Sequence, residues 1–347
     1  MSELRQDPTT KEWVVIAPER AKRPTQQPGK RHAGEWPDWD ESCPFCPRNE
    51  DRTPDEVFRI PVSAERSDWE VRVVPNLFAA LTPDGDTARY ENGPLFRKMG
   101  GFGIHEVIIE GPSHNTPIAL MPCPHIEKVL IAYQERYNAI KKNNQVRFVH
   151  LFKNHGWAAG TSLIHPHSQL VATPIMAPYY RRKFDVAHEY YADMGRCLYC
   201  DLICWELDRG KDRIVADTKE FLVVHPYASH IPYETWILPK KHCSSFGLFP
   251  STNFTELARV LKDILFCLYE KLDNPAFNLM IDSTGTEDEE DPYYHWHIRI
   301  LPRLSTIAGF EMGSGIYIST ALPEETASIT REFIKSLRRE EKISLES

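Results

Sequence analysis

A set of cysteines and histidines occurs twice along this 347-residue chain, and the repeat constrains the fold more than any other feature. Each copy holds a Cys-x-x-Cys pair, then a glutamate and a histidine eight positions apart, and finally a His-x-His motif. The last two histidine positions are separated by 51 residues in the first copy and by 53 in the second. Three matched spacings are improbable by chance, so we expect a duplicated domain.

Each half also repeats the same order of strands and one amphipathic helix, expected at Ile126–Ile140 and Phe254–Leu272. The expected strands are Trp13–Ala17, Val71–Val74, His105–Glu110, Arg147–Phe152, Phe221–Val224, Glu234–Leu238 and Phe277–Ile281. The regular strand–helix alternation of a parallel sheet is missing. We therefore predict an α+β fold with two tandem domains, residues 1–190 and 191–347, each an antiparallel sheet with packed helices, connected by residues 179–196.

The repeated cysteines and histidines suit metal binding. The predicted ligand sets are Cys43, Cys46, His114 and His165 in the first half, and Cys197, Cys200, His242 and His295 in the second. Two thiolates and two imidazoles form a closed tetrahedral set for zinc, with no open position for catalysis. We predict two structural Zn²⁺ sites per chain, because a redox role for the cysteine pairs would leave the matched histidines unexplained.

A glycine-bearing loop runs from Asn154 into the first His-x-His motif. Glycines in such a loop let backbone N–H groups approach phosphate oxygens closely. At its exit, a neutral His167 can attack a phosphorus atom, and Gln169 can hold the phosphoryl oxygens. Zinc on His165 would anchor the strand that carries His167, because the two side chains project from one face roughly 6–7 Å apart.

Simpler interpretations of these histidines exist. A strand with two hydrogen-bonded histidines and a glycine turn would also account for the first motif, but the loop and Gln169 favour phosphate chemistry. The second motif follows the acidic run 287–291, which would repel phosphate, and no glutamine follows it. We therefore expect His297 to be an inactive counterpart of His167.

Composition narrows the partners of the chain. The formal net charge of −8 disfavours broad nucleic-acid binding. No apolar run approaches the roughly 20 residues of a membrane span, and the first residues lack the apolar core of a signal peptide. We expect a cytoplasmic protein with no nucleic-acid or membrane partner.

These motifs resemble the galactose-1-phosphate uridylyltransferase family of the histidine-triad superfamily. The resemblance rests on the sequence of residues 165–169, the 154–162 loop and the paired Cys-x-x-Cys motifs, and it extends from residue 20 to residue 312. It implies two histidine-triad-like half-barrels and a role in galactose metabolism. It also implies that His167 takes a nucleoside monophosphate from a nucleotide sugar such as UDP-glucose, expelling a sugar 1-phosphate. A hexose 1-phosphate then accepts the nucleotidyl group.

The resemblance also implies roles for residues outside the two motifs. The implied substrate-binding residues are Arg20, Arg23, Asn76, Asn154, Gly160, Thr161, Ser162, Glu311 and Tyr317. It further implies a homodimer, in which Glu311 and Tyr317 of one chain reach His167 of the other. We expect the segment 309–318 to be an extended binding loop more than a helix, because it is rich in glycine. A turn that caps the second sheet is the alternative.

Departures from the family pattern leave two points undecided, namely the base of the nucleotide and the acceptor of the nucleotidyl group. Tyr317 replaces a glutamine, Ser305 and Thr306 replace a Lys-Phe pair, and Leu77 replaces an aspartate. These features are closer to a branch that includes ADP-glucose phosphorylases, where phosphate is the acceptor. A dinucleotide hydrolase is disfavoured because Gln169 stands where such enzymes carry a third histidine. A non-catalytic zinc module that binds nucleic acid is disfavoured by the acidic net charge and the widely separated ligands.

Overall fold

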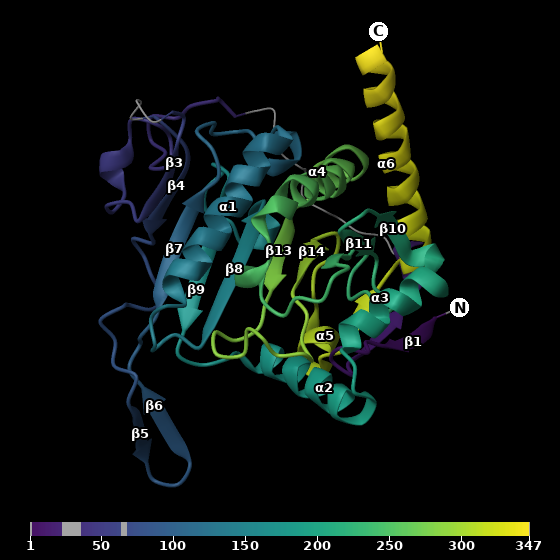
Figure 1. Cartoon of the computed structure of the whole chain (residues 1–347), viewed down its shortest axis with the longest axis horizontal. Coiled ribbons are helices and arrows are strands. Elements are labelled where there is room, and N and C mark those ends of the chain that lie inside the picture. The colour runs from purple at the N-terminus through teal and green to yellow at the C-terminus, as the bar shows by residue number, and fades with distance from the viewer. Residues whose placement is uncertain (1, 23–35, 64–67, 347) are drawn as a thin grey trace.

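One ten-stranded antiparallel sheet runs through the molecule (Figure 1), in a computed structural model that describes residues 2–22, 36–63 and 68–346. The strand order is β10-β11-β12-β14-β13-β8-β9-β7-β4-β3. The bounds are β3 Phe58–Pro61, β4 Trp69–Pro75, β7 Ile104–Ile109, β8 Phe148–His155, β9 His167–Thr173, β10 Ile214–Asp217, β11 Phe221–Val224, β12 Thr235–Pro239, β13 Phe277–Asp282 and β14 His297–Pro302.

Each half of the chain supplies five of these strands in the same spatial order. Counted from the centre of the sheet, the first half runs β8, β9, β7, β4, β3 and the second runs β13, β14, β12, β11, β10. The predicted α+β class and the antiparallel pairing are confirmed. The two sheets are not separate, however, because β8 pairs with β13, for example at Phe152 and Met280. This pairing satisfies backbone groups that would be exposed if each half ended in a free edge strand.

Helices cover the two faces of the sheet unequally. α1 (Cys123–Ile140) and α4 (Phe254–Lys271) cross one face, as Figure 1 shows, and pack on alternate strand residues such as Leu151 and Leu170. On the opposite face, α2 (Pro178–Met194) and α3 (Leu198–Asp208) cover the second half and bury Leu222, Val224, Trp236 and Leu238. The opposite face of the first half is left for the Cys-x-x-Cys loop and a cleft.

The connection expected at residues 179–196 is a helix, α2, rather than a simple linker. Pro178 lies in its first turn, and Gly195 ends it with a left-handed φ of +67°. Tyr180, Phe184 and Ala187 follow helical spacing and are all buried, which explains why the segment packs on the sheet.

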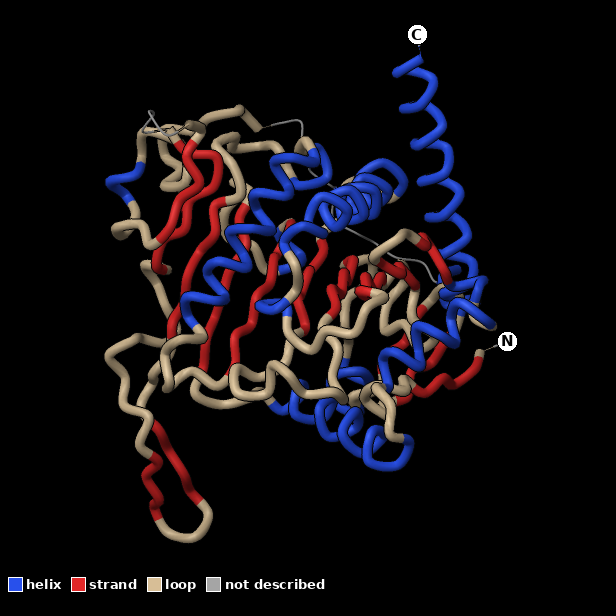
Figure 2. Tube along the Cα trace, viewed as in Figure 1, coloured by secondary structure: helices blue, strands red, loops and turns tan. Residues whose placement is uncertain are grey.

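The remaining elements surround the main sheet (Figure 2). They are β1 Glu3–Gln6, β2 Trp13–Ile16 and β15 Tyr317–Ser319 in a three-stranded sheet, the hairpin of β5 Arg89–Asn92 and β6 Phe96–Met99, and the helices α5 Gly309–Ser314 and α6 Pro323–Glu346. The prediction of an extended loop at 309–318 is wrong for its first part. Glu311 accepts the backbone N–H of Ala308 at 2.7 Å, and Gly315 adopts a φ of +73°, so both ends of α5 are capped.

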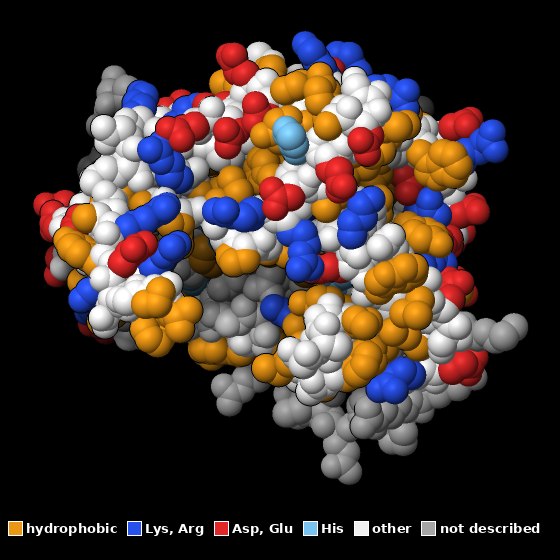
Figure 3. Space-filling view, turned by 90° about the horizontal axis from the view of Figure 1, so that it is seen from below, with side chains coloured by type: hydrophobic (Ala, Val, Ile, Leu, Met, Phe, Trp, Pro, Cys, Tyr) orange, Lys and Arg blue, Asp and Glu red, His pale blue; other side chains and the backbone are white. Residues whose placement is uncertain are grey.

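The surface bears mixed charge. On the face drawn in Figure 3, Lys and Arg side chains are interspersed with Asp and Glu side chains. Among the helices in the described part of the chain, none combines the length and the apolarity that crossing a bilayer requires.

Candidate active site and metal centres

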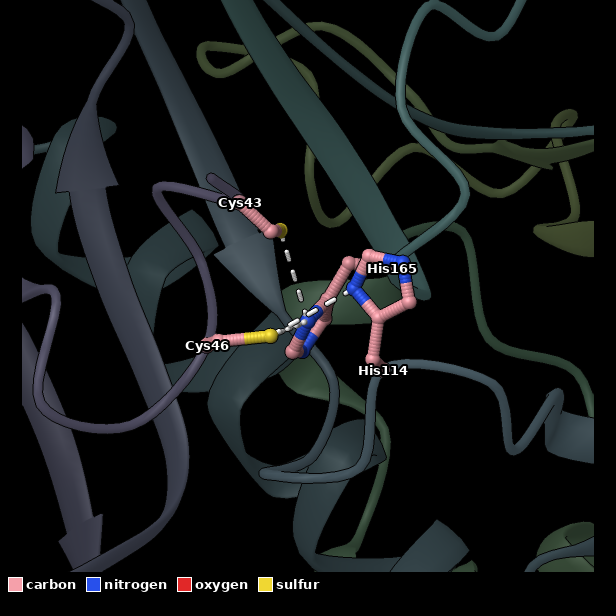
Figure 4. Close-up of side chains that lie close together, drawn as sticks. All are labelled: Cys43, Cys46, His114 and His165. Atoms are coloured by element: carbon pink, nitrogen blue, oxygen red, sulfur yellow. Dashed lines mark hydrogen bonds between the residues drawn. The ribbon is translucent and has the colours of Figure 1, made fainter. Parts of the chain in front are cut away.

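The Cys-x-x-Cys loop of the first half brings all four predicted ligands together (Figure 4). Cys46 Sγ lies 3.4 Å from His114 Nδ1 and 3.6 Å from His165 Nδ1, and Cys43 Sγ lies 3.8 Å from His165 Nδ1. All four are buried, and their ligand atoms lie within 4.8 Å of one another. His165 Nε2 donates to the carbonyl of Gly111 at 2.8 Å, which leaves its Nδ1 as a neutral ligand atom. This donor set fits a tetrahedral metal ion.

The second half brings three of its four predicted ligands together. Cys197, Cys200 and His242 form a compatible group, with Cys200 Sγ 3.3 Å from His242 Nδ1. His295 is not gathered with them, although its ring centroid lies 5.4 Å from that of His242. Its Nδ1 accepts a backbone N–H at 3.3 Å instead. Its Nε2 donates to the carbonyl of Pro239 at 2.8 Å, just as Nε2 of His165 in the first half donates to the carbonyl of Gly111.

His167 opens β9 and is held in one tautomer. Its Nδ1 lies 2.8 Å from the main-chain oxygen of His165, and since a carbonyl only accepts, Nδ1 carries the proton. The lone pair therefore resides on Nε2. Burial lowers the pKa of His167, which is 6% exposed, so the ring is neutral at pH 7. Phe45, between the two metal-loop cysteines, packs edge-on against it at 5.4 Å. This geometry is that of a nitrogen nucleophile.

A buried ion pair lies behind His167. Lys153 Nζ donates to the main-chain oxygen of His167 at 3.1 Å and to Glu110 at 2.7 Å. Ser168 and Tyr133 donate hydroxyl hydrogens to the same carboxylate. Burial alone would raise the pKa of Glu110, but Lys153 and these donors hold it below its ordinary value. The network fixes the backbone that carries His167.

Sequence reasoning missed this pair, although one signal was available. Lys153 lies on the same face of β8 as the core-facing Val149 and Leu151, so strand periodicity places a lysine inside the core. A lysine at such a position is rarely fully buried without a carboxylate partner.

A cleft of about 770 Å³ opens at His167. Its wall includes Asn154, Thr161, His165 and His167 from the first half, and Arg303, Ser305 and Thr306 from the segment after β14. Gly156 and Gly160 have φ of +77° and +92°, and a Cβ on Gly156 would lie 2.8 Å from that of Ala276. The loop therefore needs Gly156 to pass against the second half, and it needs Gly160 for a backbone conformation that L side chains rarely adopt. Gly160 and the exposed Ser162 belong to this loop but do not line the cleft.

Side-chain hydrogen bonds from the second half hold the glycine-bearing loop in place. Continuing the β8–β9 register by two residues places Asn154 opposite His167. Asn278 donates to Asn154 Oδ1 at 2.8 Å and to the carbonyl of Ala159 at 2.9 Å. Arg303 Nε in turn donates to Asn278 Oδ1 at 2.6 Å. The amide NH₂ group of Asn154 thus remains available to a ligand. No motif in the sequence pointed to Asn278 or Arg303.

Gln169 is linked to a histidine that sequence reasoning did not assign. Gln169 Oε1 lies 2.8 Å from His105 Nε2, and the same ring nitrogen lies 3.1 Å from Asn76 Nδ2. His105 therefore connects two predicted site residues from different strands. Gln169 shares the face of β9 that carries His167, because the two are two residues apart.

His297 has the backbone setting of His167 but a blocked nitrogen. Its Nδ1 donates to the main-chain oxygen of His295 at 3.0 Å. Its Nε2, however, lies 3.0 Å from the buried Lys183 Nζ, which also contacts Asp282 at 2.6 Å. Arg299 pairs with the same carboxylate at 2.7 Å. This contact with the Lys183 amino group agrees with the expectation that His297 is an inactive counterpart of His167, because the Nε2 lone pair of His297 is engaged.

Comparison with known proteins identifies the family. The N-terminal and C-terminal domain models of the galactose-1-phosphate uridyl transferase family match residues 1–177 and 183–343. The chain belongs to this family. The predicted resemblance and the class of enzyme, a nucleotidyltransferase of the uridylyltransferase type, are thereby confirmed.

Individual relatives within the family cover nearly the whole chain. An ADP-glucose phosphorylase of Arabidopsis thaliana is 35% identical over 334 residues, covering 95% of this chain and 92% of the relative. A galactose-1-phosphate uridylyltransferase of Thermotoga maritima is 29% identical, covering 96% and 98%. The crystal structure of an Arabidopsis thaliana ADP-glucose phosphorylase with bound ADP-glucose superposes with a TM-score of 0.82 at 34% identity, covering 96% and 98%.

Several residues implied by the family resemblance lie away from the cleft of their own chain. Arg20 is exposed on the turn after β2, and Arg23 lies outside the described residues. Glu311 caps α5, and Tyr317 stacks on His230 at 4.5 Å. None of the three described residues lines the cleft.

Proposed function

We propose that this uridylyltransferase relative moves a nucleoside monophosphate from a nucleotide sugar to a phosphate-bearing acceptor, with His167 as covalent carrier. His167 Nε2 attacks the α-phosphorus, and the bond to the sugar phosphate breaks with its electron pair leaving on that phosphate. An oxygen of the acceptor phosphate then attacks the same phosphorus and displaces His167. The observation that carries the proposal is the Nδ1 hydrogen bond to His165, which supports an Nε2 lone pair at the cleft.

The donor and acceptor expected from the family name are UDP-glucose and a hexose 1-phosphate. A second candidate is an ADP-glucose phosphorylase-like reaction, in which inorganic phosphate accepts the nucleotidyl group. The 35% identity to an ADP-glucose phosphorylase supports it. So do Ser305 and Thr306, which line the cleft where the sequence departs from the usual family pattern.

Labelling tests the proposed function. Protein mixed with UDP-glucose or ADP-glucose labelled in the α-phosphate should retain acid-labile label at about one nucleotidyl group per chain. Adding hexose 1-phosphate or inorganic phosphate should then discharge the label, and the faster acceptor identifies the reaction. A dinucleotide hydrolase would release free monophosphate without either acceptor. A binding module would retain no label, which would refute the proposal.

We also propose that the metal is zinc at both centres and that it is structural. The closed set of two cysteines and two histidines in the first half supports this. His295 remains the proposed fourth ligand of the second centre. The mirrored strand order supports two histidine-triad-like half-barrels, and the boundary between residues 190 and 191, like the cytoplasmic location, remains a prediction.

A homodimer with shared sites completes the proposal. Glu311 and Tyr317 lie outside the cleft of their own chain, so they are available to a partner's cleft. Phe310 and Met312 on the same helix are 54% and 78% exposed, which suits packing against a second chain. Arg20, Arg23, Asn76, Gly160, Thr161 and Ser162 remain proposed contacts of the nucleotide or its phosphates.

Subunit mixing tests the shared site. Chains with His167→Asn and chains with Glu311→Ala should each be inactive or impaired alone. Random pairing should regain about a quarter of the wild-type activity, because half of the dimers carry one intact site. Activity that stays at the parental level after subunit exchange is verified by mass spectrometry would contradict the model.

A further inference from the structure

The second-half wall of the cleft presents one guanidinium group. Arg303 is half-buried, its backbone N–H donates to Ala276 at 2.7 Å, and its Nε donates to Asn278 at 2.6 Å. Within the part of the chain that the structure describes, Arg303 forms no ion pair with a carboxylate. A guanidinium has five N–H donors, so four remain for a ligand in the cleft.

Among the described residues that line the cleft, the other Lys or Arg is Lys153, and a carboxylate offsets its charge. Lys153 contacts Glu110 at 2.7 Å, and both groups are buried. An anion entering the cleft therefore gains little from Lys153, because the carboxylate offsets its charge. Of the cleft-lining residues that the structure describes, Arg303 is the basic side chain without a carboxylate at ion-pair distance, and Asp273, Ser305 and Thr306 line the same cleft.

The strand order relates Arg303 to the nucleophile. His167, Asn154 and Asn278 lie in one row across the neighbouring strands β9, β8 and β13. Because neighbouring strands are about 4.8 Å apart, this row spans about 10 Å from His167 to Asn278, where Arg303 is anchored. A diphosphate with one phosphorus at His167 can therefore extend its other phosphate towards Arg303, past the free amide NH₂ of Asn154.

We propose that Arg303 binds the phosphate that exchanges on His167. This phosphate belongs to the sugar 1-phosphate that leaves in the first step and to the acceptor that arrives in the second. The inference rests on the proposed nucleotidyl transfer through His167. Arg303 thereby favours a phosphate acceptor over water, because water carries no charge for the guanidinium to bind.

The test measures the second step alone. Labelled nucleotidyl-enzyme is prepared with excess nucleotide sugar, freed of that substrate, and discharged with inorganic phosphate or glucose 1-phosphate at increasing concentrations. Arg303→Met should still reach about one label per chain, although more slowly. The acceptor concentration for half-maximal discharge should rise roughly 10- to 100-fold, because a charge-assisted hydrogen bond is lost. Discharge by water should change little, so the ratio of transfer to hydrolysis should fall.

Further variants separate charge from positioning. Arg303→Lys should restore part of the acceptor affinity, whereas Arg303→Gln, which keeps a donor for Asn278 but no charge, should not. Arg209→Gln is the matched control, because Arg209 is exposed and lies outside the cleft, and it should match the wild type. All variants are compared after circular dichroism confirms their fold, and Arg303→Gln replaces Arg303→Met if the latter does not fold.

Two outcomes would overturn the inference. One is a normal half-saturating concentration in Arg303→Met and Arg303→Gln. The other is an Asn278→Ala variant that reproduces the full defect while Arg303→Lys restores nothing, which would make Arg303 a positioning residue for Asn154. In both cases the wild type still becomes labelled, so the proposed function stands. Absence of label on the wild type would instead refute the proposed function and the inference with it.

Discussion

Replacing His167 by asparagine is expected to abolish nucleotidyl transfer, with a loss on the order of 10⁴-fold or more in turnover. Asparagine can still donate a hydrogen bond to the main-chain oxygen of His165, so the start of β9 should keep its geometry. It has no nucleophilic nitrogen, because its amide lone pair is delocalised. Steady-state turnover and covalent labelling with α-labelled nucleotide sugar measure the effect.

The second half offers a matched control for this variant. His297→Asn changes the same residue type in the same backbone setting, but Lys183 already occupies the Nε2 lone pair of His297. Folded His297→Asn protein should therefore still become labelled. Metal content and thermal stability of His167→Asn should match the wild type. Near-normal turnover in His167→Asn would show that another group is the nucleophile.

Removing the first metal centre is expected to lower stability and activity together. Cys43→Ser should reduce the bound metal by one ion per chain and lower the melting temperature, because closed zinc sites contribute folding free energy. The metal connects the cysteine loop to His114 and His165 in the structural proposal, and Phe45 of that loop packs on His167. Loss of the metal should therefore also misplace the nucleophile. Elemental analysis, calorimetry and labelling measure the three effects.

Serine variants of two other cysteines show whether the loss of a thiol by itself causes these effects. Cys200→Ser should remove the second metal and some stability, but folded protein should still label His167. Cys204 is exposed and belongs to neither ligand group, so Cys204→Ser should change nothing. Metal-free protein with full stability and activity would contradict a structural role for zinc.

Local sequence patterns correctly predicted several helices and strands whose hydrophobic residues pack on the core. The strand predicted at Phe221–Val224 has those bounds in the structure, and the helix predicted at Phe254–Leu272 is α4, which ends one residue earlier. The first ligand set also followed from the sequence, because repeated spacing reveals residues that must converge. Prediction was wrong for α5, where the capping contact of Glu311 with Ala308 outweighs the tendency of glycines to form a loop.

Local sequence patterns also failed to predict that the strands of the two halves join in one sheet. Each half carries a complete set of strands, and from the sequence we predicted a separate sheet for each half. The pairing of β8 with β13 depends on two edges meeting in space, which no local periodicity encodes. The same pairing places Asn278 against Asn154 and so brings the second half to the glycine-bearing loop of the candidate active site.

The sequence by itself determined the family of this protein and the group of first-half side chains that meet in space, and it predicted the duplication and the candidate nucleophile His167, because each depends on residue types at short, repeated spacings. Only the tertiary structure decided which charges are compensated. Lys153 meets Glu110 43 residues away, and Lys183 meets Asp282 99 residues away. Arg303 has no such partner in the described chain and faces the cleft. Burial makes each pairing obligatory, but strand register and helix docking select the partner, and these arise only when the whole chain is packed.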